Sequence, residues 1–181
     1  MEIHSEKIIN ERSKIEQKTI LFEQIMNCYQ NRIYHFVRRM ILQPDDALDV
    51  TQNTFLLAWE KLHQFNGKSQ FSTWLHQIAY HEALQWIKKQ KRLDNYTLNS
   101  PGLPQFSHLM VDEQHILQWL YEAIELLPPK QRAVFVLKYF DEKKFEEIHL
   151  ITGTSVGALK ASYHIAVQKV EEFLIKKNHL L

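Results

Sequence analysis

The chain has 181 residues, of which 45% are hydrophobic, with only 4 glycines and 5 prolines and a formal net charge of +1. This composition predicts a folded, helix-rich protein of one or two small domains and excludes a disordered chain or an all-β fold with many hairpins. The single cysteine, Cys28, excludes a disulfide framework or a cysteine-based zinc site within one chain.

The N-terminal residues are rich in charge, and no apolar run approaches the ~20 residues that a membrane span requires. We therefore expect a soluble protein of the reducing cytoplasm that does not insert into a membrane. Residues 1–19 are expected to form a tail or a frayed helix. Cys28 is interpreted as a packing residue of an apolar helix, because a free cysteine behaves as a small hydrophobe.

A long amphipathic helix is predicted near residues 19–42, where apolar side chains recur at near-helical spacing. Pro44 and Asp45 end it and begin a second helix, since proline suits a first helical turn and acidic residues favour a helix N-terminus. One face of this second helix is apolar. The other face is available to a partner and carries Asp49, Gln52, Asn53, Leu56 and Glu60.

A turn and a third helix follow. Residues 65–70 include Asn66 and Gly67, which are typical of a turn, and a fresh apolar period begins at Phe71. Trp74 lies next to this apolar stripe, so we interpret it as a core residue rather than a base-stacking one. Opposite the stripe runs a polar row that can lie along a nucleic-acid strand and consists of Gln77, His81, Gln85, Lys88 and Arg92.

Charge is distributed unevenly over these two helices. Between residues 44 and 60 the only charged side chains are acidic, whereas six basic residues and one acid lie between residues 61 and 92. This separation indicates one surface for a protein partner and another for phosphates.

Residues 94–111 contain Asn-Ser-Pro-Gly-Leu-Pro and little periodicity, which predicts a flexible linker between domains at 20–93 and 112–181. The second domain begins with a helix near Asp112, which the Leu126-Leu-Pro-Pro129 segment ends. Another helix is predicted from Gln131 to Phe140.

The segment 145–164 predicts two short helices around a glycine turn. Phe145, Ile148 and Ile151 recur at helical spacing, Gly153 can adopt the left-handed conformation that ends a helix, and Ser155 can cap the next helix. This pattern is typical of a helix-turn-helix unit, whose second helix enters the DNA major groove. The predicted fold class is therefore all-α, with two small helical domains and a C-terminal helix-turn-helix.

Three stretches in this order resemble the bacterial RNA polymerase sigma factors of the extracytoplasmic-function type, within the sigma-70 family. They are residues 46–59, residues 65–79, and residues 127–160 with their Leu127-Pro-Pro-Lys-Gln-Arg motif. The resemblance implies a first domain that binds core RNA polymerase and the minus-ten promoter element, and a second that reads the minus-thirty-five element. It also implies promoter melting without catalysis or a cofactor, and regulation by an anti-sigma factor.

The resemblance further implies roles for individual residues. Polymerase binding is carried over to Asp49, Gln52, Asn53 and Leu56. Minus-ten DNA binding is carried over to Asn66, Lys68, Gln77, His81, Gln85, Lys88 and Arg92. Minus-thirty-five DNA binding is carried over to Ser155, Val156, Gly157, Lys160, Ala161, His164 and Arg132.

Some positions depart from the commonest family pattern. Asn66 stands where arginine is more frequent, and His81 where asparagine is frequent, so base preference cannot be copied from relatives. Ile165 stands where arginine or histidine is common. A less basic recognition helix predicts weaker or more partner-dependent binding to the minus-thirty-five element.

Two other functional classes compete with this interpretation. An enzyme is suggested by His76, His81 and Glu82, but a helical zinc protease needs histidines one turn apart, and these are five residues apart. A stand-alone helix-turn-helix regulator would explain the C-terminal half. It would leave the polar face of the second helix and the basic block at 61–92 without a role.

Overall fold

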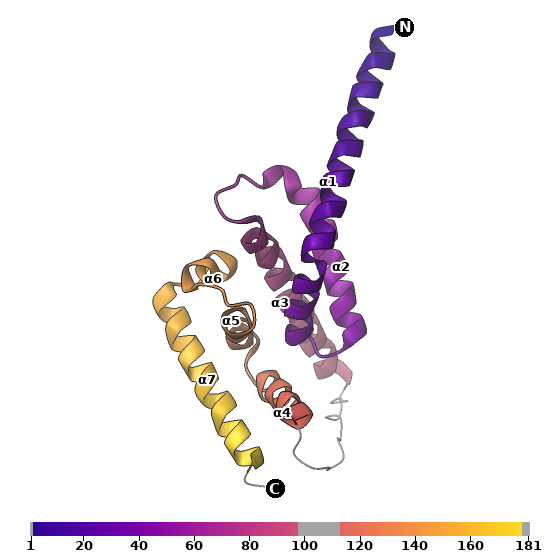
Figure 1. Ribbon diagram of the computed structural model, residues 1–181. Helices are drawn as coiled ribbons and strands as arrows, with labels where there is room; N and C mark the ends of the chain where they lie inside the picture. The colour runs from indigo at the N-terminus through magenta and orange to yellow at the C-terminus, as the bar shows by residue number, and fades with distance from the viewer. Residues whose placement is uncertain (1, 98–112, 179–181) are drawn as a thin grey trace.

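The computed structural model describes residues 2–97 and 113–178, and every regular element in this part of the chain is helical (Figure 1). The predicted all-α class is confirmed. In chain order the elements are α1 (Glu2–Met40), α2 (Pro44–Lys61), the 3₁₀ turn η1 (Leu62–Gln64), α3 (Phe71–Thr97), α4 (Glu113–Glu125), α5 (Pro129–Tyr139), α6 (Phe145–Thr152) and α7 (Val156–Asn178).

Helices α1, α2 and α3 form the first domain around one apolar core. Proline occupies the first turn of α2 together with Asp45 and Asp46, as the sequence predicted. The core takes every third or fourth residue of each helix, including Ile33, Phe36, Val37, Met40, Ala47, Val50, Phe55, Ala58, Leu75, Ala79 and Ala83. This spacing places the remaining side chains of α2 and α3 on the outside.

Helix α1 differs from its prediction in its start and in the burial of Cys28. It begins at Glu2 rather than near residue 19, and its N-terminal part projects beyond the rest of the molecule (Figure 1). Cys28 lies exposed on this helix, so its interpretation as a packing residue was wrong. The reason is the register of α1, which turns Phe22, Met26 and Tyr29 toward the core instead.

Helices α4 to α7 form the second domain. Helix α5 is its central element, with five consecutive buried residues from Ala133 to Leu137, and α6 and α7 pack against it, while α4 packs against α7. Ile148 and Ile151 of α6 and Leu159 of α7 are also fully buried. The helix-turn-helix is thus held rigidly on a small core. The linker was expected at residues 94–111. Helix α3 continues to Thr97, and residues 98–112 lie outside the described part of the chain.

The two domains lie directly against each other, with α6 on α3 and α5 on α1 (Figure 1). Among the described residues, three polar contacts across this boundary join side chains of one domain to the other. Arg132 donates to the Met40 carbonyl at 2.8 Å, the Arg39 guanidinium lies 4.1 Å from the centre of the Phe140 ring, and His76 Nε2 lies 3.4 Å from Asp141 Oδ2. The sequence predicted two domains but no contact between them.

Candidate nucleic-acid and polymerase interfaces

The exposed face of α2 is the first candidate interface. Its four predicted partner-binding residues, Asp49, Gln52, Asn53 and Leu56, are all exposed. On the buried side, the Thr51 and Thr54 hydroxyls donate to backbone carbonyls one turn earlier, at 2.7 and 2.8 Å. The exposed side combines acid and amide groups with Leu56, which is 62% exposed. This face therefore presents charged, amide and apolar groups together on one side of α2.

The turn at 65–70 is held from two directions. The Asn66 side-chain oxygen accepts a hydrogen bond from the Lys68 backbone N–H at 3.1 Å, and Gly67 has a φ of 72°, which favours glycine. Below the turn, the rings of Phe65, Phe71 and Trp74 pack with centroids 5.3–5.4 Å apart. Trp74 is half-buried in this aromatic cluster, which confirms its interpretation as a core residue.

Asn66 was predicted to bind minus-ten DNA, but its side-chain oxygen makes a hydrogen bond within the turn. Its amide oxygen shapes the turn, whereas the Lys68 side chain is exposed at the turn's tip. Lys68 therefore places a positive charge at the exposed end of the turn.

The polar row of α3 lies on the surface as predicted. Its five members, Gln77, His81, Gln85, Lys88 and Arg92, are exposed, while Leu75, Ala79 and Ala83 between them are buried. His81 Nδ1 lies 2.7 Å from the Gln77 carbonyl oxygen. Because a carbonyl oxygen only accepts, Nδ1 carries a hydrogen in this contact. The row thus offers amides and one imidazole near the turn, and cations further along.

The helix-turn-helix has the local chemistry that the sequence predicted. Gly153 is left-handed, with a φ of 71°, and its N–H donates to the His149 carbonyl at 2.8 Å. The Ser155 hydroxyl accepts from the Ala158 N–H at 3.4 Å and so caps α7. These two devices fix the angle between α6 and the N-terminal turns of α7.

The predicted reading residues of α7 lie on one surface. Ser155, Gly157, Lys160, Ala161 and His164 are exposed, and Val156 is half-buried. The Lys160 ammonium lies 5.9 Å from the Phe145 ring centre, and that of Lys138 lies 5.2 Å from the same ring. Two cations therefore converge beside the start of the recognition helix.

Arg132 does not belong to that surface in this structure, contrary to its prediction as a minus-thirty-five contact. Its guanidinium points inward and donates to the carbonyls of Met40, Glu125 and Leu127. Burial lowers the pKa of the guanidinium, with an opposing effect from the Glu125 charge. The residue joins the C-terminal ends of α1 and α4, where free helix carbonyls favour a cation.

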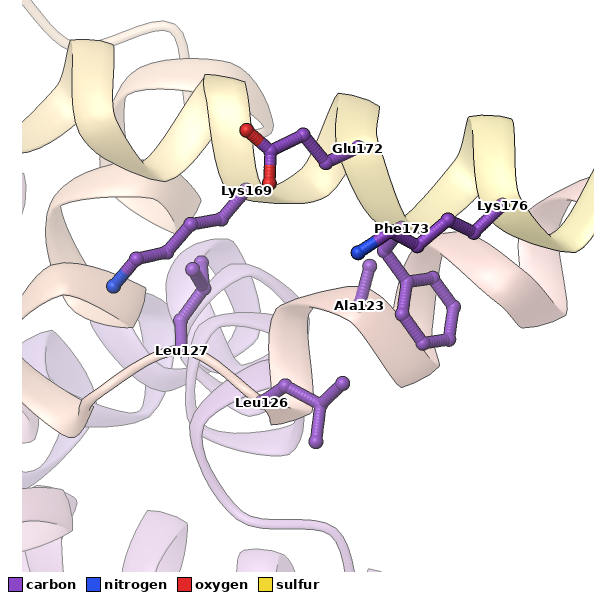
Figure 2. A pocket seen from close by; sticks show the side chains of 7 residues that line it. All are labelled: Ala123, Leu126, Leu127, Lys169, Glu172, Phe173 and Lys176. Carbon is purple, nitrogen blue, oxygen red and sulfur yellow. The ribbon is translucent and has the colours of Figure 1, made fainter.

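A groove of about 220 Å³ between the end of α4 and the C-terminal half of α7 was not predicted (Figure 2). Ala123, Leu126, Leu127 and Phe173 supply apolar groups, and Lys169, Glu172 and Lys176 supply charged ones. Leu126 is 64% exposed. The sequence predicted Leu126 only as part of a Leu-Leu-Pro-Pro segment that ends a helix. The groove was not predictable, because Phe173 on its other side lies 47 positions further along the chain.

The histidines that suggested an enzyme lie on different faces of α3. His76 is buried and His81 is exposed, as the five-residue spacing predicted. The described residues contain no group of three histidine, cysteine or acidic side chains that could hold a metal ion. In the same part of the chain, no helix is both long and apolar enough to cross a membrane.

Comparison with known proteins shows the family of the chain. The family model of sigma-70 region 2 matches residues 25–93, and that of sigma-70 region 4 matches residues 117–170. The chain is 31% identical to the ECF RNA polymerase sigma factor SigW of Bacillus subtilis, over 91% of this chain and 93% of that protein. The chain belongs to the sigma-70 family of RNA polymerase sigma factors. Over 91% of its length it resembles a member of the extracytoplasmic-function type.

One further relative and two solved structures are also similar to this chain. The RNA polymerase sigma-E factor of Streptomyces coelicolor is 25% identical over 87% of this chain and 88% of that protein. The solved structure of the sigma factor RpoE in complex with the anti-sigma factor NepR from Bartonella quintana has a TM-score of 0.70 at 23% identity, covering 84% of this chain and 96% of that chain. CnrH, in complex with the cytosolic domain of CnrY, has a TM-score of 0.64 at 21% identity, covering 86% and 88%.

The family membership decides between the two remaining interpretations. A sigma factor recognises promoters for RNA polymerase, and the chain carries both of its regions in order. A stand-alone helix-turn-helix regulator is not favoured, because it would not account for the region 2 match over residues 25–93.

Proposed function

We propose that the three surfaces divide the work of this sigma factor among polymerase binding, strand capture and duplex reading. The observation that carries the proposal is the exposure of all three predicted residue sets, apart from Arg132 and the half-buried Val156, on helices whose opposite faces are buried. Rigid helices keep such groups at fixed spacing, as recognition requires.

The α2 face docks on core RNA polymerase. Asp49 supplies charge that orients the encounter with a basic partner, and Leu56 supplies apolar area that is buried on binding. Full burial of a leucine stabilises a complex by about 1.5–3 kcal/mol, so this residue is the natural anchor of the surface.

The α3 row and the 65–70 turn hold the unpaired strand of the minus-ten element. Gln77, His81 and Gln85 present hydrogen-bonding groups to base edges, whereas Lys68, Lys88 and Arg92 neutralise phosphates. Captured bases cannot re-pair, so binding of the single strand drives melting without any covalent step.

The N-terminal turns of α7 read the minus-thirty-five element in the major groove. Gly157 and Ala161 permit close approach, and Lys160 can donate to guanine or to phosphate. We propose that the chain acts in the cytoplasm, as a subunit that makes no covalent change itself. An anti-sigma factor that covers these surfaces is its proposed regulator, since the structurally similar RpoE was solved in complex with the anti-sigma factor NepR.

Run-off transcription with purified core polymerase and a genomic fragment library tests the assignment of surfaces. Leu56→Ala and Gln52→Ala should weaken polymerase binding, by about tenfold or more for Leu56, and spare the isolated minus-thirty-five duplex. Lys160→Ala should do the reverse. Leu42→Ala removes a comparably exposed leucine outside the α2 face and serves as the control.

The expected result is a set of start sites that require the intact protein and share two upstream elements. Equal loss of polymerase and duplex binding in both the Leu56 and Lys160 variants would refute the division of work between the surfaces.

A further inference from the structure

Ile165 is a large apolar side chain on the exposed side of the recognition helix α7. It is 44% exposed, whereas Leu159 and Ala166 on the opposite side of the helix are fully buried in the core. Positions 158, 161 and 165 follow the i, i+3, i+7 spacing of one helix face, so Ile165 lies in line with the exposed Ala158 and Ala161. The N-terminal half of α7 therefore presents an apolar stripe on its exposed side, and Ile165 is its largest member.

The helix-turn-helix determines what this exposed side can meet. In such a unit the second helix lies in the major groove, and the first helix crosses the backbone. Helix α7 is the second helix here, and the Gly153 turn and the Ser155 cap set its angle to α6. The Lys160 ammonium lies 5.9 Å from the centre of the Phe145 ring at the start of α6, which places its charge on the side of the helix that crosses the backbone.

Few side chains on the exposed side of α7 can form hydrogen bonds with base edges. Between residues 157 and 165 the exposed positions are Gly157, Ala158, Lys160, Ala161, His164 and Ile165. Among them, Lys160 and His164 alone have polar side chains. The rest of this surface is apolar, so it can distinguish base pairs only through a group on the DNA that is itself apolar.

The major groove offers such a group at thymine. Thymine presents a C5 methyl group there, whereas guanine, adenine and cytosine present hydrogen-bond donors and acceptors. An isoleucine placed over those polar edges would displace water without supplying a partner, which costs free energy. An exposed isoleucine in the groove therefore favours thymine through the methyl contact and disfavours the other bases at the same point.

We propose that Ile165 is a specificity-determining residue that contacts a thymine methyl group in the minus-thirty-five element. The inference rests on the proposed function and deepens it, since it names the base that this chain prefers at one position of the duplex. An arginine at position 165 would instead form two hydrogen bonds with guanine. The promoters of this sigma factor should thus carry a T·A pair where an arginine at position 165 would favour G·C.

The test uses the full chain bound to core RNA polymerase. A promoter found by run-off transcription is randomised over its minus-thirty-five element, and the holoenzyme selects the duplexes that it binds. Each thymine of the selected element is then replaced, one at a time, by deoxyuridine. This change removes the methyl group and keeps every hydrogen-bonding group of the base, so fluorescence anisotropy with each duplex measures the methyl contact alone.

One thymine should be sensitive to this replacement in the parent protein. Uracil at that position should weaken binding by about fourfold, the loss expected for one methyl group buried against an apolar side chain. Ile165→Ala should bind the thymine and uracil duplexes equally. Ile175→Ala is the matched control, because it removes an isoleucine that is 56% exposed and lies about 15 Å further along the same helix, and it should keep the parental difference.

A second variant tests the assignment in the opposite direction. Selection repeated with Ile165→Arg should give guanine at the position where the parent protein selects the sensitive thymine. Alanine and arginine are both good helix formers at an exposed position, so both variants of Ile165 should fold as the parent does.

The outcomes separate this inference from the proposed function. Parental binding that tolerates uracil at every thymine would overturn the inference, as would an equal uracil penalty in Ile165→Ala or an unchanged consensus with Ile165→Arg. In each of these cases the minus-thirty-five element is still bound, and the proposed function stands. A selection that yields no minus-thirty-five consensus would instead refute duplex reading by α7, and this inference with it.

Discussion

Replacing Arg132 by glutamine should destabilise the protein by loosening the junction between its domains. The guanidinium donates to the Met40 carbonyl at 2.8 Å, to the Leu127 carbonyl at 3.4 Å, and closely to the Glu125 carbonyl. Hydrogen bonds to a charged group contribute about 1.5–3 kcal/mol each. The desolvation that lowers the pKa of Arg132 offsets part of this.

We therefore expect Arg132→Gln to cost about 3 kcal/mol of unfolding free energy. For a chain of this size the melting temperature should fall by roughly 6–12 °C. Differential scanning calorimetry measures the shift, with Lys130→Gln as the control, since it removes an exposed charge two residues away on the same helix. An unchanged melting temperature with a lower affinity for minus-thirty-five DNA would refute this reasoning and restore Arg132 as a phosphate contact.

Three further predictions concern other parts of the molecule. Gly153→Ala should destabilise by about 1–2 kcal/mol because its φ is 71°, whereas Gly157→Ala, in a helix with open space around it, should stabilise by up to about 1 kcal/mol in urea unfolding. Burial raises the pKa of Tyr80, so above about pH 10 the unfolded chain loses a proton that the folded one keeps, and stability falls as pH rises. Melting curves at pH 9–11 should show a smaller loss for Tyr80→Phe, and an equal loss in both proteins would contradict the assignment. Lys160→Ala should reduce the salt dependence of duplex binding by about one unit of slope in a fluorescence titration, and a parental slope would exclude a phosphate contact.

The secondary structure followed from local chemistry that the sequence displays. Pro44 and its acidic neighbours start α2, and Gly153 and Ser155 end α6 and begin α7. These signals act within a few residues and need no distant partner. Helical periodicity likewise separated the buried Leu75 and Ala79 from the exposed row of α3, so the candidate DNA surface was predictable.

Helical periodicity did not predict the exposure of Cys28 or the groove beside Leu126. Cys28 was expected to pack inside an apolar helix, yet it is exposed, because Phe22, Met26 and Tyr29 are the residues of this part of α1 that pack against the core. The groove beside Leu126 depends on Phe173 of another helix, and no local pattern relates these two positions.

The sequence by itself determined the helices, their amphipathic faces, the helix-turn-helix and the order of the two sigma regions, because each is encoded by neighbours within one or two turns. Only the tertiary structure decided that the domains touch, that Arg132 donates to backbone carbonyls at their junction, and that His76 faces Asp141. The physical reason is distance along the chain. Arg132 and Met40 are 92 positions apart in the sequence. Which acceptor a cationic side chain binds depends on the groups that the fold places near it.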